Sequence, residues 1–266
     1  MVREGSNDQE NVYGKLNSEF ARLNVPADFK VTRPVVLGVE FQSGKKKDVL
    51  PFILSSGEVT LKKNGIEMTR LAVRCGTTEG EREINEDCLT VIPFIVKYLE
   101  KKRVVVEDCL LVGVFDGMGG HADGEKASLA AMVGMANYVE ELNGAEAFVS
   151  QDEMLLAVAN CTWAAMVGGV SRECEVDESG TTATYAIIAA DGKYILPHVG
   201  DSRAYQLGGA RLTEDNSMVW DAFSRGDLTE EQLANSPHKN VLLDVITGGA
   251  GDGKGEFKIG HQGVLK

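Results

Sequence analysis

One stretch of the chain combines an apolar run, a carboxylate and several glycines, and it is the strongest chemical signal in the sequence. Residues 110–115 are apolar and of strand length, Asp116 follows, and Gly117, Gly119 and Gly120 come next. A buried strand with this pattern delivers one acid to the rim of a sheet, and the glycines let backbone and ligand approach closely there. A carboxylate beside bare carbonyl groups suits a hard divalent cation. Taken alone, however, this stretch is more typical of a strand that ends in a tight turn.

Three other segments strengthen the chemical interpretation. Residues 81–87 read Glu-Arg-Glu-Ile-Asn-Glu-Asp, residues 180–183 read Gly-Thr-Thr-Ala, and residues 199–203 read Val-Gly-Asp-Ser-Arg. In this order and context, the set resembles the metal-dependent type 2C serine/threonine protein phosphatases, over about residues 72 to 252. The resemblance implies hydrolysis of phosphoserine and phosphothreonine in proteins. It also implies two Mg²⁺ or Mn²⁺ ions and a third at a weaker position.

The resemblance assigns a role to each acid. Asp116 is expected to bridge the two ions, and the carbonyl of Gly117 is expected to ligate one of them. Glu86 and Asp87 are expected to bind directly or through water, and Asp201 matches the third metal position. Two ions at such a site neutralise the phosphoryl oxygens and lower the pKa of a bridging water. Without the resemblance, Glu86 and Asp87 would be typical of a solvated acidic turn.

Arg82 matches the family's phosphate-binding arginine. An arginine suits this role because its guanidinium donates two parallel hydrogen bonds to a phosphoryl group. Met118 departs from many eukaryotic members, which have a histidine there that is proposed to protonate the leaving group. The pattern Asp-Gly-Met-Gly-Gly-His is common in bacterial-type members. Two roles stay open for His121: the acid itself, or a residue that fixes the turn through hydrogen bonds.

Family members continue with an apolar strand ending in Ser-Asp-Gly and, later, an Asp-Asn pair whose aspartates complete the binuclear site. The given sequence ends at Lys266, where that strand is expected to begin. The given sequence is then either a fragment or a naturally short relative. Without the two missing aspartates, the remaining acids predict weak metal affinity. Two hypotheses follow: a metal-dependent phosphatase, or a catalytically inactive pseudophosphatase that binds a phosphoprotein or a regulatory partner.

The elements that must position these acids follow from the pattern of apolar residues. Asn64-Gly65 between alternating segments predicts a β-hairpin. A strand pair is expected at about 88–96 and 104–116, joined by a charged loop over 98–103. Small apolar residues at helical spacing predict a helix over about 127–142 that packs closely on a sheet.

Capping signals mark three later helices. Ser150 to Glu153 forms a capping box that begins a long helix, Ser217 begins a short one, and Thr229 begins another. Strands return at residues 182–189 and 194–199. The order of elements predicts an α+β fold. The resemblance sharpens this to a β-sandwich of two antiparallel sheets flanked by helices and missing its last strands. Residues 1–70 are expected to be an arm and β-rich extension, and residues 71–266 the phosphatase-like domain.

The composition narrows the partners and the compartment. The chain has 266 residues, 43% of them hydrophobic and 25% charged, with a formal net charge of −13. This acidity argues against non-specific binding to nucleic acid or an anionic membrane. No apolar run is expected to approach the roughly 18 residues that span a bilayer. The expected partner is a phosphorylated protein or a regulator, and the expected compartment is the cytoplasm, with the nucleus an alternative.

Overall fold

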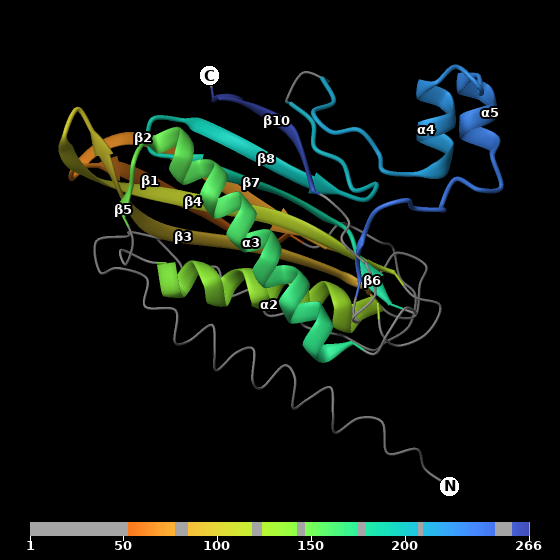
Figure 1. Cartoon of the computed structure of the whole chain (residues 1–266), viewed down its shortest axis with the longest axis horizontal. Coiled ribbons are helices and arrows are strands. Elements are labelled where there is room, and N and C mark those ends of the chain that lie inside the picture. The colour runs from red at the N-terminus through yellow and green to blue at the C-terminus, as the bar shows by residue number, and fades with distance from the viewer. Residues whose placement is uncertain are drawn as a thin grey trace, which may run out of the picture.

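The structure is a computed structural model, and it is built around one antiparallel sheet (Figure 1). It describes residues 53–77, 85–118, 124–142, 147–174, 179–206, 210–247 and 257–265. Its strands are β1 (Ile53–Lys63), β2 (Ile66–Gly76), β3 (Asp87–Glu100), β4 (Arg103–Met118), β5 (Ala147–Phe148), β6 (Gly180–Thr181), β7 (Ala183–Ala189), β8 (Lys193–Val199), β9 (Ile246–Thr247) and β10 (Lys258–Val264). Its helices are α2 (Gly124–Leu142), α3 (Gln151–Glu173), α4 (Met218–Ser224) and α5 (Glu230–Asn235).

Strand β4 is the central strand of this sheet. It pairs in antiparallel fashion with β3 on one side and with β7 on the other, and β8 and then β10 continue the sheet beyond β7. Side chains alternate along β4, as they must in a strand. Leu111 and Phe115 belong to the core beneath the helices, whereas Leu110 and Val112 face the opposite side.

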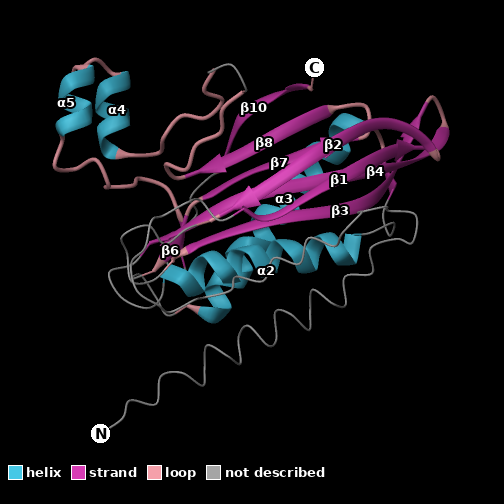
Figure 2. Cartoon of the chain, turned by 180° about the vertical axis from the view of Figure 1, so that it is seen from behind, coloured by secondary structure: helices cyan, strands magenta, loops and turns pink. Residues whose placement is uncertain are grey.

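The two faces of the sheet are covered differently (Figures 1 and 2). Helices α2 and α3 lie on one face, and the hairpin β1–β2 lies on the other, where Val59 and Leu61 pack against Leu110 and Ile188. The predicted α+β architecture of antiparallel strands and helices is therefore confirmed. Among the described residues, the hairpin is the layer that opposes the main sheet. Strand β2 runs through residue 70, where the sequence placed a domain boundary.

Helices α2 and α3 pack on each other through small residues, whereas the sequence predicted that the small residues of the first helix would pack on the sheet. Gly134 of α2 lies against the backbone of Ala165 in α3, where an added Cβ would come within 2.3 Å of a carbonyl oxygen. Gly169 of α3 likewise lies against the backbone of Ala130. Close contact between the two helix backbones lets both helices fit onto the same sheet.

Three local predictions are confirmed by the structure. Asn64 and Gly65 both have positive φ, at 52° and 77°, and form the turn between β1 and β2. Ser150 caps α3 by accepting a hydrogen bond from the backbone of Glu153. Thr229 begins α5 in a reciprocal capping box.

Two other expectations are wrong. Residues 98–103 are not a charged loop, because β3 continues to Glu100 and only Lys101 and Lys102 turn the chain, both at positive φ. The expectation about long apolar runs also fails. Residues 154–171 contain no charged side chain, and α3 is long and apolar enough to cross a membrane by length and composition alone. Part of this helix, including Met154, Val158 and Met166, is buried against α2 and the sheet.

Candidate functional site

Three of the predicted acids lie at one end of the sheet, where β3 begins and where β4 and β8 end. Asp87, the first residue of β3, is the register partner of Asp116 near the end of β4. Directly opposed residues in an antiparallel pair have Cβ atoms about 5 Å apart and on the same face. Asp87 and Asp116 therefore lie side by side, on the face of the sheet opposite the helices.

Asp201 lies close enough to this pair for its charge to interact with Asp116. It follows β8 in the turn at Gly200, whose φ is +97°. Burial raises the pKa of Asp201, and the negative charges of Asp116 and Asp215 raise it further. Acids from three separate segments thus converge, and their mutual repulsion is the kind that a bound cation relieves.

Glu86 is positioned by its backbone as well as by its neighbours. Its carbonyl oxygen accepts hydrogen bonds from the backbone of Gly117 at 3.1 Å and from Oγ of Ser128 at 2.7 Å. A Cβ added to Gly124, the first residue of α2, would lie 2.8 Å from the Glu86 carboxylate. The acid therefore sits at a helix N-terminus, where the macrodipole favours negative charge.

Gly117 has a steric reason to lack a side chain. A Cβ there would come within 2.0 Å of the carbonyl oxygen of Gly124 and within 2.8 Å of that of Glu86. Gly117 pairs with Thr181 of β6, so the last residues of β4 are fixed between β6 and the start of α2. Arg82 and His121 lie outside the described residues, and their predicted roles stay predictions.

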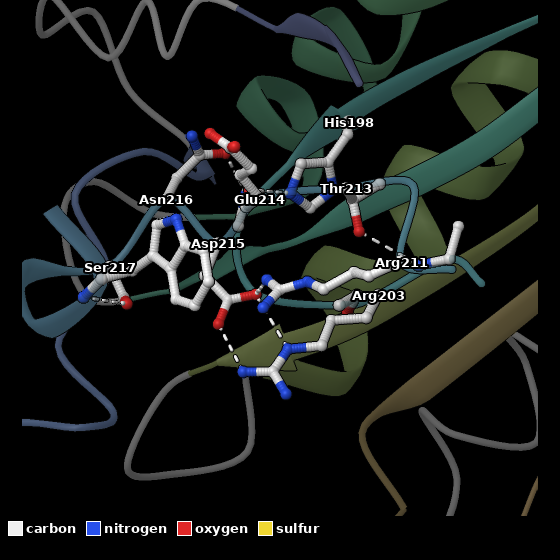
Figure 3. A network of polar contacts seen from close by, with 12 residues as sticks. His198, Arg203, Arg211, Thr213, Glu214, Asp215, Asn216 and Ser217 are labelled. Atoms are coloured by element: carbon white, nitrogen blue, oxygen red, sulfur yellow. Dashed lines mark hydrogen bonds and ion pairs between the residues drawn. The ribbon is translucent and has the colours of Figure 1, made fainter. Parts of the chain in front are cut away.

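The turn that carries Asp201 is held by a polar network of Arg203 and residues from 211–216 (Figure 3). The motifs at Arg203 and at residues 212–217 are typical of structural segments, and these contacts agree with that interpretation. Asn216 accepts a hydrogen bond from the backbone of Gly200 at 2.9 Å through its side chain. The buried carboxylate of Asp215 binds the guanidinium groups of both Arg203 and Arg211. These contacts join residues 200–203 to the segment that precedes α4, and they pair the charge of Arg203 with that of Asp215.

The donor set fits a hard, partly hydrated divalent cation. Carboxylate oxygens are the ligands that Mg²⁺ and Mn²⁺ prefer, and Mg²⁺ usually keeps several waters and takes only one or two protein carboxylates. Within the part of the chain that the structure describes, no group of three or more His, Cys, Asp or Glu side chains is close enough to enclose a metal ion. The direct ligands that the described strand ends offer side by side are the carboxylates of Asp87 and Asp116.

Several known proteins are similar to this chain in sequence or in fold. The chain is 31% identical over 141 residues to the serine/threonine protein phosphatase PstP of Mycobacterium tuberculosis, covering 52% of this chain and 26% of PstP. It is 32% identical over 139 residues to the serine/threonine phosphatase stp of Listeria monocytogenes, covering 51% of this chain and 55% of that protein. No family model matches the chain.

A solved structure supports the same relationship. The serine/threonine phosphatase of S. agalactiae superposes with a TM-score of 0.50 at 26% sequence identity, covering 70% of this chain and 71% of that one. The curated relatives are matched over only about a quarter to a half of their own length. Within those bounds, the comparisons confirm the resemblance that the motifs indicated: the chain is related to the bacterial type 2C serine/threonine protein phosphatases.

Proposed function

We propose that this chain catalyses the metal-dependent hydrolysis of phosphoserine and phosphothreonine in proteins. The observation that carries the proposal is the pairing of Asp87 with Asp116 at the end of the sheet where Asp201 follows β8. Relatives with phosphatase names support the reaction class. The alternative of an inactive regulatory module receives no support from these comparisons.

In this proposal each described acid has a defined task. Asp116 and Asp87 hold divalent ions from adjacent strands, the Gly117 carbonyl adds a neutral ligand, and Asp201 and Glu86 hold coordinated water or a weakly bound ion. When bound, these ions neutralise phosphoryl oxygens and lower the pKa of a coordinated water. Arg82 binds the phosphoryl group of the substrate through its guanidinium.

A small aryl phosphate tests the proposal without knowledge of the natural substrate. Wild type is expected to release the aryl alcohol in the presence of Mn²⁺ and to lose this activity in EDTA. Asp116→Asn removes one ligand charge at nearly constant shape and is expected to abolish the Mn²⁺-dependent rate. Asp152→Asn is a matched control, because its carboxylate lies exposed on α3 and pairs only with Lys193 among its described contacts.

The outcomes are clearly separated. Activity that needs Mn²⁺ and Asp116 but not Asp152 supports the proposed reaction. Activity that survives both EDTA and Asp116→Asn contradicts a metal mechanism. Mn²⁺ binding without any hydrolysis of aryl or peptide phosphates would favour a binding module instead.

A further inference from the structure

Thr182 lies between the strand end that carries Asp116 and the turn that carries Asp201, and it is almost completely buried, with 1% of its surface exposed. Its backbone N–H donates to the carbonyl of Asp116 at 2.9 Å. Its side-chain Oγ1 accepts a hydrogen bond from the backbone N–H of Asp116 at 3.0 Å. Both backbone polar groups of Asp116 are therefore bonded to the same residue.

The hydroxyl of Thr182 also reaches the second acid-bearing segment. Its Oγ1 lies 2.6 Å from Oγ of Ser202, the residue that follows Asp201. A hydroxyl has one proton to donate and two lone pairs, so Thr182 can accept from Asp116 and still hydrogen-bond Ser202. The hydroxyl of Thr184 donates a hydrogen bond to the carbonyl oxygen of Ser202 at 3.0 Å, so Ser202 is held through its backbone as well.

The methyl group of Thr182 completes the contact. A Cβ added to Gly200 would lie 2.5 Å from Cγ2 of Thr182, so the glycine backbone packs directly on this methyl group. Gly200 has a φ of +97°, a conformation that other residues rarely adopt. Asn216 holds the opposite side of the same turn. The hydroxyl of Thr182 thus contacts both acid-bearing segments, and its methyl group packs against the second of them at Gly200.

We propose that Thr182 is a positioning residue that fixes Asp116 and Asp201 relative to each other for divalent-cation binding. This inference rests on the proposed function, because it concerns the same candidate metal site. Thr182 itself touches neither ion nor substrate; it acts by holding the backbones of Asp116 and of the turn at residues 200–202. Outer partners of this kind typically change metal affinity by about 10- to 100-fold when they are removed.

Two substitutions separate the parts of this side chain. Thr182→Val keeps a methyl group against Gly200 and removes the hydroxyl, whereas Thr182→Ser keeps the hydroxyl and removes the methyl group. Thr90→Val is a matched control, because the buried Oγ1 of Thr90 has no hydrogen-bond partner within the described structure. Ser202→Ala breaks the same hydroxyl link from its other end and serves if Thr182→Val does not fold.

Isothermal calorimetry with Mn²⁺ on the full chain gives a readout that does not depend on catalysis. Thr182→Val and Ser202→Ala are each expected to weaken Mn²⁺ binding by about 10-fold or more, with the double variant little weaker than Thr182→Val. Thr182→Ser is expected to restore affinity to within about 3-fold of wild type, and Thr90→Val to leave it unchanged. Excess Mn²⁺ is expected to recover aryl phosphatase activity in Thr182→Val.

The failures of the two proposals are distinguishable. A folded Thr182→Val that binds Mn²⁺ as tightly as wild type overturns the positioning role and leaves the proposed function standing. Wild type that binds Mn²⁺ but hydrolyses no phosphate ester overturns the proposed function, while the affinity comparison among the variants still decides the role of Thr182. Wild type that binds no Mn²⁺ overturns both.

Discussion

Strand β4 carries an acid near each of its ends, and the two acids have opposite surroundings. Glu107 is fully buried on the face covered by the helices. Its carboxylate accepts hydrogen bonds from Nε2 of Gln151 at 3.0 and 3.1 Å and from the backbone of Ala190 at 3.1 Å. The positive charge of Lys63 also favours its ionised form. Donors from α3 and from the turn after β7 therefore meet at this carboxylate.

At the other end of β4, Asp116 has acids among its neighbours. Asp87 is the register partner of Asp116. The negative charge of Asp116 also contributes to the raised pKa of Asp201. Repulsion of this kind lowers the stability of the metal-free fold, in return for a site that attracts cations. One end of β4 thus uses its carboxylate to join elements of the fold, whereas the other end brings carboxylates together, and the proposed cation site rests on that arrangement.

The largest expected difference between the two ends is in catalysis. Asp116→Asn is expected to lower the Mn²⁺-dependent kcat/KM by at least about 100-fold, because it removes a charged ligand. Glu107→Gln is expected to change it by less than about 3-fold, because Glu107 lies on the other face and at the far end of the strand. Initial-rate kinetics with an aryl phosphate at saturating Mn²⁺ provide the measurement. Equal losses of kcat/KM in the two variants would contradict the different roles assigned to the two ends of β4.

The next largest effect is expected in stability at the Glu107 end. Gln151→Ala is expected to lower the free energy of unfolding by about 2 to 3 kcal/mol, because it leaves a buried carboxylate without two of its hydrogen bonds. Urea denaturation measures this loss. Asp152→Ala, which breaks only an exposed ion pair one residue away, is the control and is expected to change stability by less than about 0.5 kcal/mol.

The pH dependence of that loss has a defined sign. Burial raises the pKa of Glu107 above its ordinary value of 4.5, while contacts with Tyr98 and Gln151 oppose the rise. The native state then binds the proton more tightly than the unfolded state, so stability falls as pH rises from that value through the native pKa. Removing Gln151 raises the native pKa further. The deficit of Gln151→Ala is therefore expected to be larger at pH 8 than at pH 4.5, and a deficit independent of pH would contradict this.

A smaller stability effect is expected at the adjacent hairpin turn. The side chain of Asn64 accepts a hydrogen bond from the backbone of Val106 at 3.0 Å, and its φ is 52°. Asn64→Ala is expected to lower the free energy of unfolding by about 1 to 2 kcal/mol, because it loses this bond and places alanine in the left-handed region. Thermal unfolding checks this. Asn64→Gly is expected to recover part of the loss, and Mn²⁺ affinity is expected to stay unchanged in both variants.

The smallest expected effect has the opposite sign. Asp201→Asn is expected to raise the stability of the metal-free protein by a few tenths to about 1 kcal/mol, because it removes a carboxylate whose charge burial and Asp116 both oppose. The same variant is expected to gain less stability than wild type when Mn²⁺ is added. Urea denaturation in EDTA and in Mn²⁺ gives both numbers. A variant less stable than wild type in EDTA would show that Asp201 is held mainly for structure.

Local signals in the sequence predicted local structure well. Asn64-Gly65, Ser150 and Thr229 each mark a turn or a cap whose geometry depends on neighbouring residues only. The family resemblance implied that Asp87 and Asp116 share one site, and the strand register places the two residues side by side. The role of Glu107, and the specific link that Thr182 makes between Asp116 and residues 200–202, could not be predicted from the sequence. Glu107 is 44 residues from Gln151 and 83 residues from Ala190 along the chain, and Thr182 is 66 residues from Asp116. At such separations no periodic pattern in the sequence identifies a contact.

A crystal of the wild-type chain soaked in Mn²⁺, with data collected for anomalous scattering, tests the central claim most directly. The account predicts an anomalous peak bound by a carboxylate oxygen of Asp116, at about 2.0 to 2.4 Å, on the side that faces Asp87 and Asp201. The peak should disappear in Asp116→Asn. Full Mn²⁺ occupancy elsewhere on the chain, with none at Asp116, would contradict the account.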